Sequence, residues 1–186
     1  MKVTPPLRRS KVRQTHEGLE IVIPAKRNLF LMLFLAAWLV GWSVGEVFAI
    51  RELLTGESEA PDLFLAAWLV MWTVGGSVAL YTWLWMARGF EVILLRSNVL
   101  AIRHDVLGLG RTREYDLSHV SNLRVAPAVW NPYDWSSAMQ FWGVGGGSVA
   151  FDYGARTFRF AASVDEAEAR DIVNDLKAQY LFPGPD

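Results

Sequence analysis

Among the side chains of this 186-residue chain that could act in catalysis or ion transport, Glu46 stands in the most unusual place. It is the only acidic residue in two long apolar stretches, 29–50 and 63–87. A carboxylate inside a membrane-crossing segment is a functional candidate, for example on an ion path. However, Glu46 falls near the end of its stretch, where it can reach interfacial water. The second stretch has Gly76 at the equivalent position, which also favours a merely structural interpretation.

Other chemical signatures are missing or weak. The absence of cysteine excludes disulfides, thiolate metal sites and thiol nucleophiles. The histidines, His16, His104 and His119, lie outside the apolar stretches, so haem or chlorophyll ligation there has no support. The run Gly143–Gly147 lacks the Lys-Ser/Thr of a phosphate-binding loop. We therefore expect no enzymatic activity, no metal and no cofactor, and the net charge of −1 argues against nucleic-acid binding.

The elements that would position these residues begin with a repeat. Leu33–Val40 returns letter for letter as Leu63–Val70, within the two apolar stretches. At about 1.5 Å per helical residue, such stretches can cross a hydrocarbon layer of roughly 30 Å. They predict a hairpin of two transmembrane helices over residues 29–87, at about 29–50 and 63–87.

Charges outside the helices predict the orientation. The segment before them is basic: it carries Lys2, Arg8, Arg9, Lys11, Arg13, Lys26 and Arg27 against Glu17 and Glu20. The connection 51–62 has Arg51 against Glu52, Glu57, Glu59 and Asp62. Because Lys and Arg remain on the cytoplasmic side, residues 1–28 and 88–182 are expected in the cytoplasm.

Small residues recur every four positions along one face of the first helix, at Ala37, Gly41 and Gly45. The second helix keeps Ala67 and Gly75 but has Met71 at the position between them. Such a stripe lets another helix approach closely, either within the hairpin or from a partner subunit. Small residues are also common in membrane helices generally, so the stripe has an ordinary explanation too.

After residue 88 the pattern changes from helical to alternating. It predicts antiparallel strands at 90–95, 99–104, 111–115, 121–125, 148–153 and 156–160. A helix follows, with Ser163 as its N-cap and Glu166 completing a capping box. Residues 19–23 also read as a short strand, and our hypothesis is that it joins the same sheet from the other side of the hairpin.

This order of elements resembles a pleckstrin-homology-like (PH-like) domain, in a bacterial arrangement where the domain follows a two-helix membrane hairpin. The segments that carry the resemblance are Glu91–Ile93, Gly108–Asp116, Asn122–Val125, Phe151–Gly154 and Asp165–Ala169. The resemblance implies an α+β membrane protein whose antiparallel β-barrel or sandwich ends in one C-terminal helix. In lipid-binding members of the wider family, basic residues crowd the first hairpin, whereas here that hairpin offers Arg96 alone. Fold likeness by itself carries no function.

One loop is unusually aromatic. Its candidate interaction residues are Trp130, Tyr133, Trp135, Phe141 and Trp142. Exposed aromatic residues mark binding or membrane-interface surfaces, although such a loop can also fold over the domain as core.

These observations lead to one functional expectation and several alternatives. We expect a non-enzymatic interaction or scaffold protein of the bacterial inner membrane, with both termini cytoplasmic. Its partners would be the lipid bilayer and other membrane subunits or copies of itself. The alternatives are an accessory subunit of a respiratory, photosynthetic or transport complex, and a module that senses lipid headgroups.

Overall fold

The computed structural model describes residues 9–56, 62–126 and 146–184. The chain divides into two compact units. The helical unit is Arg27–Ala87, and the sheet domain combines Met1–Lys26 with Arg88–Asp186. Each is described by itself below.

The helical unit consists of α1 (Leu29–Thr55) and α2 (Asp62–Arg88). Both are long and apolar enough to cross a membrane. Helix α1 begins where the Asn28 side chain accepts a hydrogen bond from the Leu31 amide, and it ends at Gly56 in the left-handed conformation. It therefore continues past the predicted end at residue 50, because Arg51 and Glu52 interrupt the apolar pattern but are good helix formers.

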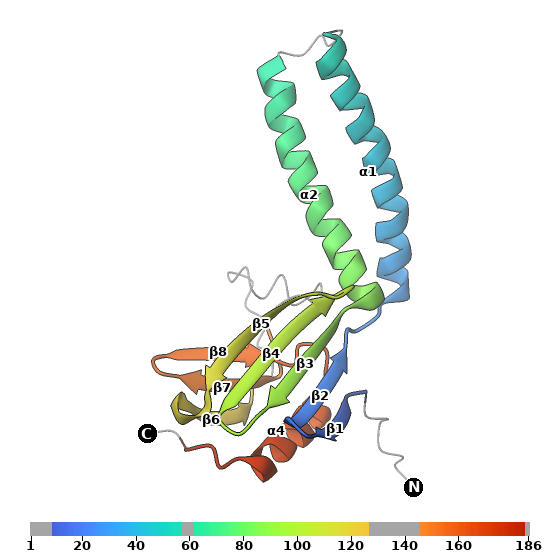
Figure 1. The fold of residues 1–186 in the computed structure, drawn as a ribbon. Helices are drawn as coiled ribbons and strands as arrows, with labels where there is room; N and C mark the ends of the chain where they lie inside the picture. Colours follow the sequence, from blue (N-terminus) through green and yellow to red (C-terminus); the bar gives the residue numbers. More distant parts are fainter. Residues whose placement is uncertain (1–8, 57–61, 127–145, 185–186) are drawn as a thin grey trace, which may run out of the picture. The chain divides into compact units, whose positions relative to one another are not determined.

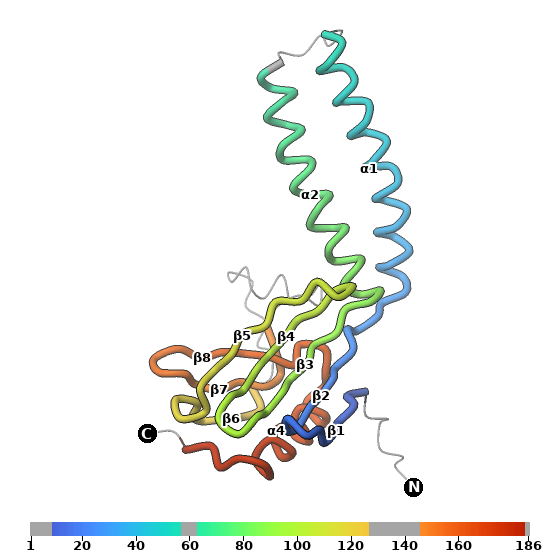
Figure 2. The backbone as a smooth tube through the Cα atoms, viewed as in Figure 1, coloured from blue at the N-terminus to red at the C-terminus, as the bar shows by residue number. Residues whose placement is uncertain are grey.

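The sheet domain contains a five-stranded and a three-stranded antiparallel sheet (Figures 1 and 2). The first sheet runs in the order β1 (Lys11–Thr15), β2 (Gly18–Pro24), β3 (Phe90–Leu95), β4 (Val99–Val106), β5 (Leu109–Asp116). After the short helix η1 (Leu117–His119), the second sheet runs β6 (Val120–Val125), β7 (Val149–Tyr153), β8 (Arg156–Phe160). Helix α4 (Glu166–Gln179) ends the fold and lies against β6 and β2.

The first sheet is assembled from both sides of the helical unit. Strand β2 precedes α1, β3 follows α2, and they pair antiparallel with Ile21 opposite Ile93. Beyond the strands, the Ala25 amide donates to the Gly89 carbonyl at 3.0 Å. The predicted strand 19–23 is therefore an internal strand of this sheet, because β2 pairs with β3 along one edge and with β1 along the other.

The core of the domain is made by both sheets and α4 together. Phe151, Ile21 and Ile172 are fully buried in one cluster. Tyr115 packs edge-on against Phe151, with ring centroids 5.0 Å apart. Burying this apolar surface is the main force that holds the two sheets together.

The expected closed barrel is not found within the described ranges, and this part of the prediction needs correction. No ladder joins β5 or β1 to the three-stranded sheet among the residues that the structure describes. Strand β5 is exposed over most of its length and becomes buried at Tyr115. The sheets are joined by core packing, and the fold is mixed α+β.

The predicted helix cap is also wrong by two residues. Asp165, not Ser163, is the N-cap of α4, and its carboxylate accepts from the Glu168 amide at 2.8 Å. Ser163 instead accepts from the Lys26 amide at 3.3 Å through its hydroxyl. Aspartate and serine are about equally good N-caps. The contact of Ser163 with Lys26 belongs to the tertiary fold, and the sequence alone does not reveal it.

Candidate functional site

The two helices approach each other at a tryptophan and a glycine. A Cβ added at Gly76 would overlap the indole of Trp42. The Trp42 Nε1–H donates to the Trp72 carbonyl at 3.2 Å, which ties the same indole to the opposite backbone. Trp72 is the counterpart of Trp42 in the repeat, and its ring lies 3.8 Å from the position of a Cβ on Gly45. The repeat therefore pairs two tryptophans with two glycines across the helices.

Most of the predicted small-residue stripe takes no part in this contact. A Cβ on Gly41 or Gly75 would meet no described atom within 4 Å. Ala37 and Ala67 are exposed as well. Of the five predicted positions, Gly45 contacts the opposite helix, whereas Gly76, the glycine in closest contact with Trp42, was missed. The repeat aligns Gly76 with Glu46, which hides its role from a comparison of the two copies.

Glu46 connects the helices through a short polar contact. The Thr73 hydroxyl lies against Glu46 Oε1 and also within 2.8 Å of the Leu69 carbonyl. One hydroxyl hydrogen cannot serve both acceptors at once. The other carboxyl oxygen, Oε2, is buried without a partner among the described residues.

The aromatic loop cannot be placed in this arrangement. Trp130, Tyr133, Trp135, Phe141 and Trp142 all lie outside the described residues, and their predicted role stays a prediction.

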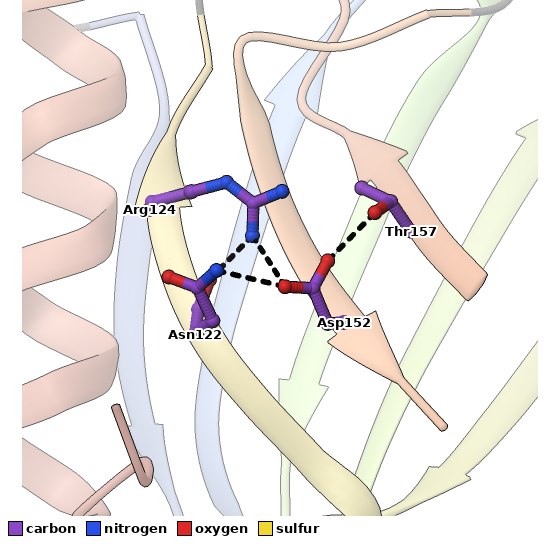
Figure 3. Close-up of polar contacts among 4 residues, drawn as sticks. All are labelled: Asn122, Arg124, Asp152 and Thr157. Carbon is purple, nitrogen blue, oxygen red and sulfur yellow. Dashed lines mark hydrogen bonds and ion pairs between the residues drawn. The ribbon is translucent and has the colours of Figure 1, made fainter. Parts of the chain in front are cut away.

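In the sheet domain, the densest polar cluster surrounds Asp152 (Figure 3). Its carboxylate accepts from Arg124 at 2.8 Å, from the Asn122 amide group at 2.8 Å and from the Thr157 hydroxyl at 2.7 Å. These hydrogen bonds, with that of Arg124 the strongest, lower the pKa of Asp152 to about 2.

This cluster braces an irregularity of the sheet. The β6–β7 register shifts between Ser121 and Arg124, and Asn122 has a positive φ of 52°. Asn122 and Asp152 belong to two of the segments that carry the PH-like resemblance. Its hydrogen bonds link β6, β7 and β8, and the cluster therefore stabilises this irregular part of the sheet.

Glu91 is the carboxyl in the described part of the domain whose pKa is strongly raised. It points inward from β3, is 2% exposed, and accepts from the Ala161 amide at 3.0 Å. Burial raises its pKa to about 7, although the hydrogen bonds from the Ala161 and Ala162 amides oppose the shift. His104 Nε2 lies 3.4 Å away.

Glu91 and His104 do not form an ordinary ion pair. Burial and the charge of Arg113 lower the pKa of His104, so both partners resist charging near neutral pH. The signal for Glu91 was present in the sequence: it has the same inward parity as Ile93 and Leu95 in β3. Its hydrogen bonds join the first sheet to the segment after β8, a structural role.

A shallow hollow of about 620 Å³ lies on the outer face of the first sheet. Its floor is apolar, with Val92 and Leu94 half-buried. The rim carries both signs of charge, Glu20 and Glu114 against Arg96 and Arg103. Because charges of both signs line its rim, the hollow does not favour an anionic ligand over a cationic one. Within the described residues, no group of acidic, histidine or cysteine side chains is arranged to hold a metal ion.

Comparison with known proteins gives no relative. No protein-family model, no curated protein and no solved structure matches the chain. The class that the structure itself defines is a mixed α+β chain, with two long apolar helices inserted between two strands of one sheet.

Proposed function

We propose that this chain is a non-enzymatic, two-pass membrane protein that carries its sheet domain at the cytoplasmic face and associates through its helices with other membrane subunits or with copies of itself. The sheet domain would be PH-like, in the bacterial arrangement that the sequence resembles. The run of antiparallel strands that ends in amphipathic α4 supports this assignment.

The observation that carries the proposal is the apolar surface of the helical unit. Phe30, Leu33 and Leu63 are 81%, 72% and 83% exposed. Leaving apolar surface in water costs roughly 25 cal/mol for each Å², and contiguous apolar patches of this kind mark membrane or protein contacts. A lipid bilayer would cover both helices along their length.

The pairing of β2 with β3 supports a two-pass topology. Strands of one sheet must lie on the same side of a membrane, and β2 precedes both helices whereas β3 follows them. An even number of crossings is therefore needed, which two helices supply. The basic N-terminal segment and the acidic connection 51–62 favour the cytoplasm for the sheet domain.

The unused small residues support association with another helix. Gly41 and Gly75 have open space where a side chain would be. Without a hydrophobic driving force in lipid, helices associate where small residues allow close van der Waals contact. The partner would seat on the faces that contain these glycines.

The test is co-purification from the native membrane. We expect wild-type chain, extracted in mild detergent, to carry a stoichiometric partner or a second copy with another tag. Gly41→Leu and Gly75→Leu should each reduce this recovery at least tenfold, because leucine fills the space that the partner helix needs. Val44→Leu is the matched control, since Val44 is an exposed, already bulky residue of α1, and it should leave recovery unchanged.

Two outcomes would overturn the proposal. Equal recovery from all variants would remove the glycine faces as the contact. Release of the wild-type chain from membranes by alkaline carbonate would remove the membrane-spanning assignment itself.

A further inference from the structure

The turn between β4 and β5 has an unusual residue at its tip. Val106 and Leu109 are the last paired residues, so Leu107 and Gly108 form a two-residue turn. Their φ angles are 55° and 84°. Two successive positive φ values are the pattern of a type I′ hairpin turn, in which Asn, Asp or Gly is favoured at the first position.

Leucine is poorly suited to this position for two reasons. Its Cβ is disfavoured at positive φ. Its side chain is also 57% exposed, and that of Leu109 beside it is 87% exposed. In a hairpin surrounded by water, neither position would favour a leucine. Backbone outliers of this kind point to a functional role.

The turn holds these leucines in a fixed place. Asp105, which is 1% exposed, accepts a hydrogen bond from the Gly108 amide at 2.7 Å. Its other oxygen is paired with Arg103. The missing side chain of Gly110 leaves the room that this pair occupies, because a Cβ there would lie 2.5 Å from Arg103 Nε.

The register places the turn at a defined end of the sheet. Asp105 is opposite Phe90, the first residue of β3, and Figure 2 shows the β4–β5 turn at the end where β3 begins. Phe90 follows Arg88, the last residue of α2, by two positions. At no more than about 3.6 Å per residue, Phe90 therefore lies within about 7 Å of Arg88.

The part of the hairpin nearest the leucines is basic, whereas Glu114 and Asp116 lie farther from the turn on β5. Residues 103–113 contain Arg103, Arg111 and Arg113 against one acid, Asp105, which Arg103 neutralises. Arg111 and Arg113 are exposed. Leucines at the tip with arginines behind them match the layering of a membrane surface, in which acyl chains lie beneath anionic headgroups.

We propose that the β4–β5 hairpin is a membrane-interface anchor: Leu107 and Leu109 insert into the bilayer that α1 and α2 cross, while Arg111 and Arg113 bind anionic headgroups. The inference rests on the proposed membrane-spanning topology and adds a second, peripheral contact to it. A protein partner on the same tip is the competing occupant. Lipid fits better because the chain enters this end of the sheet two residues after α2, and exposed leucines beside exposed arginines match acyl chains beneath anionic headgroups.

Single-site spin labelling tests the anchor in the full-length chain, which has no native cysteine. Leu109→Cys carries the label in nanodiscs of phosphatidylcholine with phosphatidylglycerol. Ser97→Cys is the control, because Ser97 lies in the exposed turn at the opposite end of the same sheet. Val44→Cys reports on insertion of α1.

We expect the label at 109 to collide more often with oxygen than with an aqueous nickel chelate, and the label at 97 to show the reverse. An aqueous label at 109 with a lipid-exposed label at 44 would overturn the anchor alone. Aqueous labels at both 44 and 109 would overturn the membrane-spanning topology. A label at 109 shielded from both reagents would indicate a protein partner and also overturn the anchor.

A second variant guards against misfolding as an explanation. Leu107→Asn should improve the turn, since asparagine tolerates positive φ, yet it should shift the label at 109 toward water. Unchanged amide exchange in β4 would show that the hairpin is intact. If the collision ratio at 109 stays the same in this variant, Leu107 has no part in anchoring.

Discussion

The helical unit and the sheet domain treat apolar side chains in opposite ways. In the sheet domain, Phe151, Ile21 and Ile172 are completely shielded. In the helical unit, Phe30 and Leu63 face outward, and the main contact is a tryptophan seated on a glycine. The sheet domain has its own nonpolar interior, whereas the helical unit leaves most of its apolar side chains uncovered, as helices that could span a membrane do.

Polar groups show the same contrast. In the sheet domain the buried carboxylates Glu91, Asp105 and Glu168 all have hydrogen-bond partners. In the helical unit, Glu46 Oε2 and Trp72 Nε1 are buried without one among the described residues. An unsatisfied polar group is costly wherever it is buried, which makes this part of the helical pair the place where a further partner would gain most.

The largest expected effect comes from truncating one phenylalanine in each unit. Phe151→Ala should destabilise the sheet domain by about 3–5 kcal/mol, because it opens a cavity in a close-packed core. Phe34→Ala, at a position 54% exposed, should change stability by no more than about 0.5 kcal/mol. Pulse proteolysis in urea reports the sheet domain, and thermal loss of helicity in micelles reports the helices. Equal costs would show that the helices are packed like a water-soluble core.

The second prediction concerns how the stability of the sheet domain depends on pH. It distinguishes the two units because Glu91 belongs to the sheet domain. A carboxyl whose folded pKa is raised to about 7 stabilises the fold fully below its ordinary value of 4.5. That contribution is lost as the pH rises from 4.5 to 7, because the unfolded chain releases the proton first. The loss is on the order of 3 kcal/mol.

Glu91→Gln removes this titration while retaining an acceptor for the Ala161 amide. The variant should gain stability relative to wild type as the pH rises from 5 to 8, as measured by pulse proteolysis of the sheet domain at each pH. The helical unit should show no such difference. A constant gap between variant and wild type across this range would contradict the raised pKa.

The smallest effect is expected when alanine replaces one of two neighbouring glycines of α2, Gly75 or Gly76. Gly76→Ala should destabilise the helical pair by about 1–2 kcal/mol, because the new methyl group displaces the Trp42 indole. Gly75→Ala meets open space and should be neutral or slightly stabilising, since alanine favours helix. Thermal unfolding in micelles measures both, and a cost at residue 75 equal to that at 76 would mean that the helices pack on another face.

Periodicity predicted the elements whose burial is one-sided. The segment 156–160 alternates between polar and aromatic residues and forms β8, the apolar segment 90–95 forms β3, and the two long apolar stretches form α1 and α2. Strand β1 was missed because Lys11–Thr15 lies at an exposed edge and has no apolar alternation. Its basic residues were interpreted as an orientation signal.

The contacts that matter most for function depended on information that one chain does not contain. The sequence revealed the stripe at Gly41 and Gly45. It did not reveal that Gly76 faces the opposite helix, because the rotation of each helix about its own axis is set by the packing of the two helices. Likewise, Arg9 was assigned to a basic cluster, whereas it donates to the Ala25 carbonyl at 3.0 Å and to the Ser163 carbonyl at 3.2 Å. Such long-range pairs follow from the tertiary fold and have no local pattern.

The pairing of β2 with β3 has a consequence for biosynthesis. Strand β2 can pair with β1 as soon as it is made, but its other edge must wait until both helices and then β3 have been made. At about 5–20 residues per second, the roughly seventy residues from the end of β2 to the end of β3 take roughly 4–14 seconds to synthesise. In the proposed two-pass topology, β3 would emerge on the opposite side of the membrane from β2 if the second helix failed to insert, and the sheet could not form. Completion of the sheet would therefore require that both helices insert.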